Sequence, residues 1–156
     1  MDVFSPERRS EIMRCVHSRG TQPEMAVRKA IREAGYRYRL HAKGLPGTPD
    51  IVLAGLRKAI FVHGCFWHRH TCPSATLPKS NRDYWEGKQT RNTARDKRNI
   101  RRLRIAGWRV LVVWECEVKN SERLRRRLPD IQTQSWHNLR WRSAYELYIK
   151  RLQRVR

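Results

Sequence analysis

Residues 59–72 read Ala-Ile-Phe-Val-His-Gly-Cys-Phe-Trp-His-Arg-His-Thr-Cys. The stretch begins as an apolar, strand-like segment and passes directly into a run of cysteines and histidines around the adjacent pair Phe66 and Trp67. Such a density of metal-ligand and acid–base side chains is unusual in a segment with a purely structural role. We therefore expect this stretch to connect the core of the fold to its functional site.

The neighbouring segments predict the sheet to which this stretch belongs. Residues 51–54 are apolar and residues 55–58 have the composition of a turn, so residues 51–62 predict a β-hairpin. Residues 108–114 are almost continuously apolar, which indicates a strand buried on both faces. Residues 36–40 alternate aromatic or apolar side chains with arginine, the pattern of a half-buried strand.

Helices are predicted on either side of these strands. Thr21 and Glu24 have the spacing of a capping box, in which Thr21 accepts a backbone N–H and the Glu24 carboxylate returns to the Thr21 amide. This helix should run to about Ala34 and end at Gly35. Residues 73–84 resemble a loop, and residues 90–106 predict a strongly basic helix whose apolar seam is Ile100, Leu103 and Ala106.

Length and charge limit the class of protein. A chain of 156 residues fits one domain. Its 35 Lys and Arg outnumber its 14 Asp and Glu, for a formal net charge of +21, and such a field attracts polyanions. Nucleic acid is the expected partner, and basicity that serves only solubility is the alternative.

The two ends of the chain add to this basic character. Residues 1–20 predict a basic N-terminal arm with a helix from about Ser5 to Arg14, whose Arg14 and Arg19 would face a phosphate backbone. The alternative is a solvated terminal helix. With residues 21–118 as the core, residues 119–156 form a basic extension, with a helix that Pro129 halts and a further helix candidate from Ser143 to Leu152.

Cysteine usage points to metal ligands. The N-terminus has no apolar secretion segment, and no uncharged run approaches the roughly 20 residues that cross a bilayer, so we expect a cytoplasmic protein with no membrane association. In a reducing compartment cysteines rarely form disulfides, and clustered ones favour a metal site. Cys15 has no neighbouring ligand and is expected to be structural.

The spacing Cys65-x4-His70-x-Cys72 supplies three ligands, and Cys116 at the end of a predicted strand can supply a fourth. A Cys3His set is typical of a closed structural zinc site. On spacing alone His68 could replace His70. Without a metal, the thiols would be ordinary small apolar side chains.

Other residues near this stretch have chemistry of their own. If zinc takes His70, the side chains of His63 and His68 remain available to activate water. Asp50 precedes a predicted core strand, where it is either a turn residue or a metal-binding carboxylate. Phe66 and Trp67 lie in a polar segment unsuited to a core, and exposed rings there could wedge between stacked bases.

A set of motifs then resembles one known family. The motifs are Pro46-Gly-Thr-Pro-Asp50, Phe61-Val-His-Gly-Cys-Phe-Trp-His68-x-His70-x-Cys72, Tyr84-Trp85, Arg95-Asp96-x-Arg98 and Gly107-Trp-Arg-Val-Leu-Val-Val-Trp-Glu-Cys116. Together they resemble the very short patch repair endonucleases of bacteria. The resemblance covers residues from about 5 to 118, and the run from His63 to His68 is its most specific part.

This resemblance implies an α/β fold, a mixed central β-sheet flanked by helices, like that of restriction endonucleases of the PD-(D/E)xK class. It also implies a magnesium-dependent enzyme that nicks double-stranded DNA on the 5′ side of a thymine mispaired with guanine and so begins repair of deaminated 5-methylcytosine. Phe61 and His63 stand where the wider superfamily has its (D/E)xK pair, as in the short patch family itself.

The resemblance also assigns roles to residues. Asp50 and the backbone carbonyl of Val62 would bind magnesium, although Val62 replaces the family's usual hydroxyl residue. His68 would orient or deprotonate the attacking water with support from Asp96, and His63 would lie near the scissile phosphate. The remaining assignments are Glu24 in the outer shell of metal-bound water and Phe66, Trp67 and Trp85 as intercalating rings.

Two other functions fit parts of the sequence. A zinc-stabilised DNA-binding module without catalysis would explain the charge, the cysteines and the aromatic residues, but it leaves Asp50, His68 and Asp96 without roles. A restriction-type nuclease that cuts paired DNA is the second. We expect a monomer, with mismatch-repair proteins as candidate partners.

Overall fold

The computed structural model describes residues 8, 11, 19–79, 81–120, 122–124, 126 and 127. Within this part of the chain four strands form a single sheet in the order β1-β2-β3-β4. The strands are β1 (Arg39–Leu40), β2 (Ile51–Leu53), β3 (Lys58–His63) and β4 (Arg109–Trp114). The helices are α2 (Gln22–Glu33), α3 (Arg82–Ile105), α4 (Glu115–Val118) and the short 3-10 turns η1 (Ala54–Leu56) and η2 (Pro73–Ala75).

The sheet is mixed, as the sequence predicted. β1 pairs antiparallel with β2, and β2 pairs antiparallel with β3, which confirms the hairpin. β3 and β4 are parallel and are joined by a long crossover that includes α3. Arg57 closes the hairpin turn with a φ of 47°, in the left-handed region.

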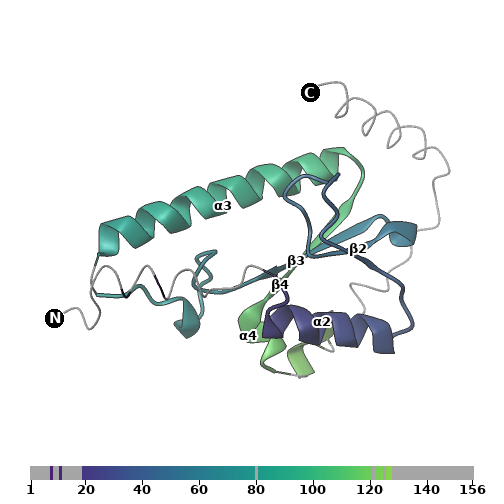
Figure 1. Ribbon diagram of the computed structural model, residues 1–156, viewed down its shortest axis with the longest axis horizontal. Coiled ribbons are helices and arrows are strands. Elements are labelled where there is room, and N and C mark those ends of the chain that lie inside the picture. Colours follow the sequence, from purple (N-terminus) through teal and green to yellow (C-terminus); the bar gives the residue numbers. More distant parts are fainter. Residues whose placement is uncertain are drawn as a thin grey trace.

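The two long helices lie on opposite sides of the sheet (Figure 1). Val27 and Ile31 of α2 pack with Ile60 and Val113 in one buried cluster. Leu103 of α3 packs with Ala59, Phe61 and other side chains in a second cluster. Because side chains alternate along a strand, β3 and β4 contribute to both clusters, and the predicted α/β class is confirmed.

Three predicted elements differ from the structure. The strand expected at residues 36–40 is limited to Arg39 and Leu40, both exposed, because only these two residues pair with β2. The helix expected from Thr90 begins at Arg82, since Trp85 and Gln89 lie one turn apart on its buried side. β4 has core on both faces, yet most of its side chains are only half-buried, with Val113 fully covered.

The remaining predictions concern the ends of the elements. α2 begins at the N-cap Thr21 and is followed by Gly35 with a φ of 82°, as predicted. α4 was not predicted, because Glu115–Val118 is too short to show a helical period. The N-terminal arm is described only at residues 8, 11, 19 and 20, and the segment from residue 128 onward lies outside the described residues. No helix in the described ranges has the length and apolar character to span a membrane.

Candidate active site and metal centre

A pocket of about 370 Å³ opens where the start of β2 and the end of β3 face α3. The strands bring carboxylate and imidazole groups to its floor, and the helix supplies charged and polar side chains to its wall. It is lined by Gly47, Thr48, Asp50, Phe61, Val62, His63, His68, Arg95, Asp96 and Asn99. Four predicted site residues, Asp50, His63, His68 and Asp96, therefore share one cavity.

His63, His68 and Asp96 form a compact group in this pocket. The imidazole rings of His63 and His68 stack with centroids 3.8 Å apart and planes 8° from parallel. Nδ1 of His68 lies 2.5 Å from Oδ2 of Asp96. An ionised carboxylate favours a proton on the nitrogen that faces it, so Asp96 leaves Nε2 of His68 as the proton acceptor.

The surroundings of these groups set their charges. Burial lowers the pKa of His63 to about 4, and the charge of His68 adds to the effect, so His63 is neutral near pH 7. Burial alone would raise the pKa of Asp96. The hydrogen bond with His68 and the nearby positive charges outweigh burial, and the pKa is lowered. Asp96 is therefore an ionised carboxylate that pairs with Nδ1 of His68.

Asp50 lies beside these groups on the strand floor. Its Oδ2 accepts the backbone N–H of Val62 across the hairpin at 2.8 Å. Burial nevertheless raises the pKa of Asp50, and the neighbouring Glu24 carboxylate adds to this effect. A carboxylate in these surroundings is stabilised in its charged form by a cation.

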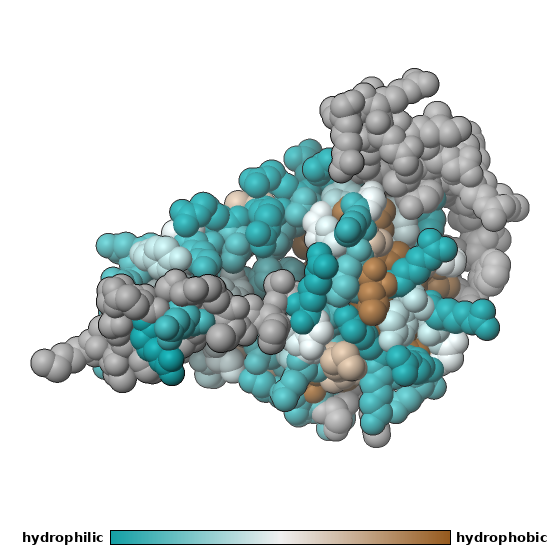
Figure 2. Space-filling model, in the orientation of Figure 1, coloured by the Kyte–Doolittle hydropathy of each residue, from teal (hydrophilic) through white to brown (hydrophobic). Residues whose placement is uncertain are grey.

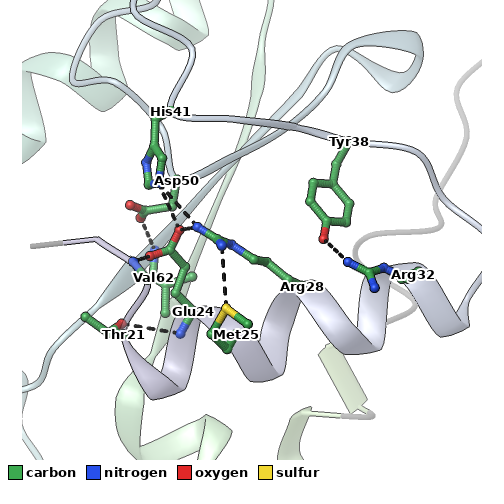
Figure 3. Close-up of polar contacts among 10 residues, drawn as sticks. Thr21, Glu24, Met25, Arg28, Arg32, Tyr38, His41, Asp50 and Val62 are labelled. Atoms are coloured by element: carbon green, nitrogen blue, oxygen red, sulfur yellow. Dashed lines mark hydrogen bonds and ion pairs between the residues drawn. The ribbon is translucent and has the colours of Figure 1, made fainter.

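Glu24, His41 and Asp50 form a second group of possible cation ligands, whose donor atoms lie within 4.8 Å of one another. Oε1 of Glu24 accepts from the Arg28 guanidinium and lies 3.3 Å from Nε2 of His41. Figure 3 shows the Glu24 carboxylate between these side chains and close to Asp50. The side chain of Glu24 is only 3% exposed, so its charge depends on these partners.

The capping interaction of Glu24 differs from the one predicted. Thr21 accepts the Glu24 N–H as expected, but Oε2 of Glu24 accepts the N–H of Gly20 at 2.7 Å instead of that of Thr21. Gly20 has a φ of 65°, and this left-handed turn brings its amide toward the carboxylate.

Sequence reasoning also missed His41, Arg28, Arg95 and Asn99. His41 reaches the site because its N–H pairs with the carbonyl of Asp50 at 3.2 Å, next to the short β1–β2 ladder. The turn motif that precedes Asp50 indicated a site residue at its end, but it gave no sign of a residue across the ladder.

The four predicted zinc ligands come together beside the pocket. The ligand atoms of Cys65, His70, Cys72 and Cys116 all lie within 4.8 Å of one another. In a tetrahedral zinc–thiolate site the sulfur atoms are about 3.8 Å apart, so these residues fit such an ion. His70 lowers the pKa of Cys72, whereas burial raises the pKa of Cys65. His68 does not belong to this group.

The three predicted intercalating residues form one aromatic cluster. Phe66 and Trp67 make edge-on contacts with Trp85, with centroids 5.3 Å and 6.0 Å apart. Trp85 is buried at 8% exposure, while Phe66 and Trp67 are half-buried. Gln89 of α3 donates to the Phe66 carbonyl at 2.6 Å and so fixes the segment above the helix. Phe66 and Trp67 are therefore the rings with accessible surface.

The predicted phosphate contacts of the N-terminal arm are only partly visible. Arg19 is exposed. Arg14 and the structural role expected for Cys15 lie outside the described residues.

Comparison with known proteins identifies relatives of this chain. Residues 1–74 match the family model of the DNA mismatch endonuclease Vsr. The chain is 52% identical over 130 residues to the type II nicking enzyme V.XorIIP of Xanthomonas oryzae pv. oryzae, which covers 83% of this chain and 96% of that protein. It is 46% identical over 127 residues to the type II nicking enzyme V.NmeAIP of Neisseria meningitidis, or 81% of this chain and 91% of that protein. It is 40% identical over 123 residues to the DNA mismatch endonuclease Vsr of Escherichia coli, 79% of each chain.

Proposed function

This chain belongs to the DNA mismatch endonuclease Vsr family, and from that membership we propose that it nicks DNA on the 5′ side of a thymine mispaired with guanine. The nick would begin the repair of deaminated 5-methylcytosine. The observation that carries the proposal is the shared pocket, in which Asp50 lies with the stacked histidines and Asp96. An oxygen ligand for a cation beside a polarised histidine suits hydrolysis of a phosphodiester.

The pocket fits a divalent cation at Asp50, since burial raises the pKa of this carboxyl and a bound positive charge would offset that effect. Asp50 and the backbone carbonyl of Val62 would hold magnesium, and Glu24 would contact its water shell. When bound, magnesium would neutralise the charge that develops on the phosphate during cleavage.

The chain's own residues would move the proton. Asp96 holds the Nδ1 proton of His68, so Nε2 accepts a proton from the attacking water. His63 is neutral near pH 7 and can donate a hydrogen bond to the scissile phosphate without adding charge. Its stacking on His68 limits the orientations that the His68 ring can take.

We propose that the aromatic cluster selects the mismatch. Phe66 and Trp67 have accessible ring surface and rest on the buried Trp85. Rings inserted between base pairs unstack them at a cost of a few kcal/mol per step, and a mispaired step costs less. The cluster would therefore favour a T·G site before any base is read.

The cysteine cluster would hold zinc for structure, because all four protein ligands of a tetrahedral ion are present and no position remains for substrate. Elemental analysis of purified protein should give one zinc per chain, retained when magnesium is withdrawn. Active protein that contains no zinc would refute this assignment.

The deciding experiment compares nicking of duplexes that differ at one base pair. With magnesium, the protein should nick a T·G duplex in the thymine strand and leave the matched C·G duplex intact, across a library of flanking sequences. Equal cutting of both would support a restriction-type nuclease that acts on paired DNA. Asp50→Ala should bind the T·G duplex without nicking it. A folded, DNA-bound wild-type protein that leaves the T·G duplex intact would instead support a binding module.

DNA binding should depend strongly on salt, because a chain of net charge +21 releases counterions from the phosphates it contacts. We propose that the protein acts as a monomer in the cytoplasm. Light scattering should give one chain per particle without DNA. For the salt dependence, an affinity for DNA that does not change between low and moderate salt would contradict the electrostatic contribution.

A further inference from the structure

The wall of the pocket formed by α3 contains two side chains with no role in the proposed proton transfer. Arg95 and Asn99 are four residues apart, so they lie on the same face of the helix as neighbours of Asp96. Figure 2 shows that hydrophilic residues cover most of the visible surface of α3. Arg95, Asp96 and Asn99 line the pocket from this helix, so its wall is polar where a ligand would enter.

Asn99 is half-buried, yet its side-chain amide has no hydrogen-bond partner among the residues that the structure describes. A carboxamide carries two N–H donors and one acceptor. Because the amide lines an open pocket and is not engaged by a neighbouring side chain in the described part of the chain, its donors are available to a ligand that enters the pocket.

The turn before β2 is fitted closely to Asn99. Gly47 has a φ of 75°, and a Cβ placed on it would lie 2.8 Å from Nδ2 and 2.9 Å from Cβ of Asn99. A larger residue at position 47 would therefore displace Asn99. The close contact limits the rotamers of Asn99 and holds its amide at the pocket wall.

Arg95 supplies the charge that this wall needs. The pocket contains the carboxylates of Asp50 and Asp96, both of which repel a phosphate. The guanidinium of Arg95 lies 3.5 Å from Asp96 Oδ1 through one nitrogen, and its side chain is 56% exposed. Its remaining N–H groups can pair with an anion in the fork geometry that suits phosphate.

We propose that Arg95 and Asn99 form a subsite for the scissile DNA phosphate, in which both side chains donate to its non-bridging oxygens. The Gly47 turn fixes the position of Asn99 in this subsite. The subsite rests on the proposed nuclease function, since it assigns the side of the pocket that receives the phosphate of the cut strand. It places the phosphate between the α3 wall and Asp50.

The test is a binding cycle on two T·G duplexes, without divalent cation so that no cleavage occurs. One duplex is normal, and the other has a neutral methylphosphonate in place of the phosphate on the 5′ side of the mispaired thymine. Asn99→Ala should weaken binding of the normal duplex about 10-fold, the scale of one hydrogen bond to a charged group, and should have no effect with the methylphosphonate. Asn99→Asp, of nearly the same size, should weaken it further through repulsion.

Arg95→Ala should also weaken binding of the normal duplex and leave binding of the methylphosphonate duplex unchanged. On the normal duplex it should reduce the magnitude of the slope of log affinity against log salt by about one. Lys97→Ala is the matched control. This exposed cation lies on the same helix but does not line the pocket, so its effect should be equal on both duplexes. Thermal unfolding and zinc content of each variant establish that it folds. If Arg95→Ala does not fold, Arg95→Gln takes its place, because it also removes the charge but keeps a long polar side chain.

Variants of Arg95 and Asn99 that weaken both duplexes equally would overturn the subsite. This outcome is distinguishable from failure of the proposed function. If the wild-type protein nicks T·G duplexes but the Arg95 and Asn99 variants weaken binding of both duplexes equally, only the subsite is refuted. If the variants weaken binding of the normal duplex alone but the wild-type protein never nicks it, the nuclease function is refuted and the subsite is retained.

Discussion

The cysteine cluster of Cys65, His70, Cys72 and Cys116 and the candidate catalytic pocket both take residues from the segment 63–72, yet they differ in their donor atoms and in how open they are. The cluster gathers sulfur donors and one imidazole into a closed group suited to zinc. The pocket gathers carboxylates and imidazoles around an open space of about 370 Å³. One group of ligands is complete without a substrate, whereas the other leaves room for one.

A tight backbone turn separates the two sets. The N–H groups of His68 and His70 bond to the carbonyls of Gly64 and Cys65, and Arg69 between them has a φ of 53°. This left-handed residue is uncommon for a side chain other than glycine. It allows histidines two positions apart to join different groups, His68 with Asp96 and His70 with the cysteines.

The largest expected effect comes from His68. His68→Ala should reduce nicking of a T·G duplex by roughly 10²- to 10⁴-fold, the contribution of a positioned general base. Zinc content should remain at one per chain, because His68 is outside the cysteine group. Rates under single-turnover conditions and elemental analysis of the same sample check both results.

His70→Ala is the matching substitution in the cysteine cluster, and it should weaken metal binding and stability. Loss of a metal site belongs to the few changes that reduce the free energy of unfolding by about 4 kcal/mol or more. The variant should release zinc to a chelator and melt at a lower temperature. If His70→Ala keeps zinc and His68→Ala loses it, the two histidines have exchanged roles.

A substitution of Asp96 tests whether nicking depends on how this carboxylate orients the His68 ring. Asp96→Asn keeps the size of the side chain but removes the charge that holds the proton on Nδ1 of His68. Nicking should fall by at least roughly 10- to 100-fold, the range for removing the carboxylate partner of a metal-bound histidine, and a general base can depend on such a partner more strongly. Zinc content should be unchanged, and DNA affinity should not fall, because the substitution removes a carboxylate that repels the phosphate. A rate equal to that of the wild type would show that His68 needs no such partner.

The same comparison shows what could be predicted from sequence. The hairpin, the strand 109–114 and the grouping of three cysteines with His70 were predictable because apolar period and ligand type are local properties. The contact of Glu24 with Arg28, one helical turn away, follows from the same kind of local pattern. The contact of Glu24 with His41 does not, because His41 arrives through the two-residue β1 ladder. Gly87 and the polar residues before it concealed the first turns of α3, which tertiary packing of Trp85 and Gln89 stabilises.

Trp114 is the residue that touches both regions, and it should produce the smallest effect. The parallel register of β3 and β4 places it opposite His63. Its ring meets His63 edge-on with centroids 5.4 Å apart and stacks on His70 with centroids 4.3 Å apart. The ring therefore packs against His63, which lines the pocket, and against His70 of the cysteine cluster.

Trp114→Phe removes part of a half-buried ring, so it should lower the free energy of unfolding by about 1 kcal/mol, near the centre of the range for single substitutions. Unlike His68→Ala and His70→Ala, it should change both regions together, with faster release of zinc and slower nicking. Trp108→Phe is the matched control, because Trp108 precedes the same strand but packs in the cluster around Leu103. It should reduce stability and leave zinc release unchanged. A Trp114→Phe variant that alters only one of the two measurements would show that the regions are independent although Trp114 contacts a histidine of each.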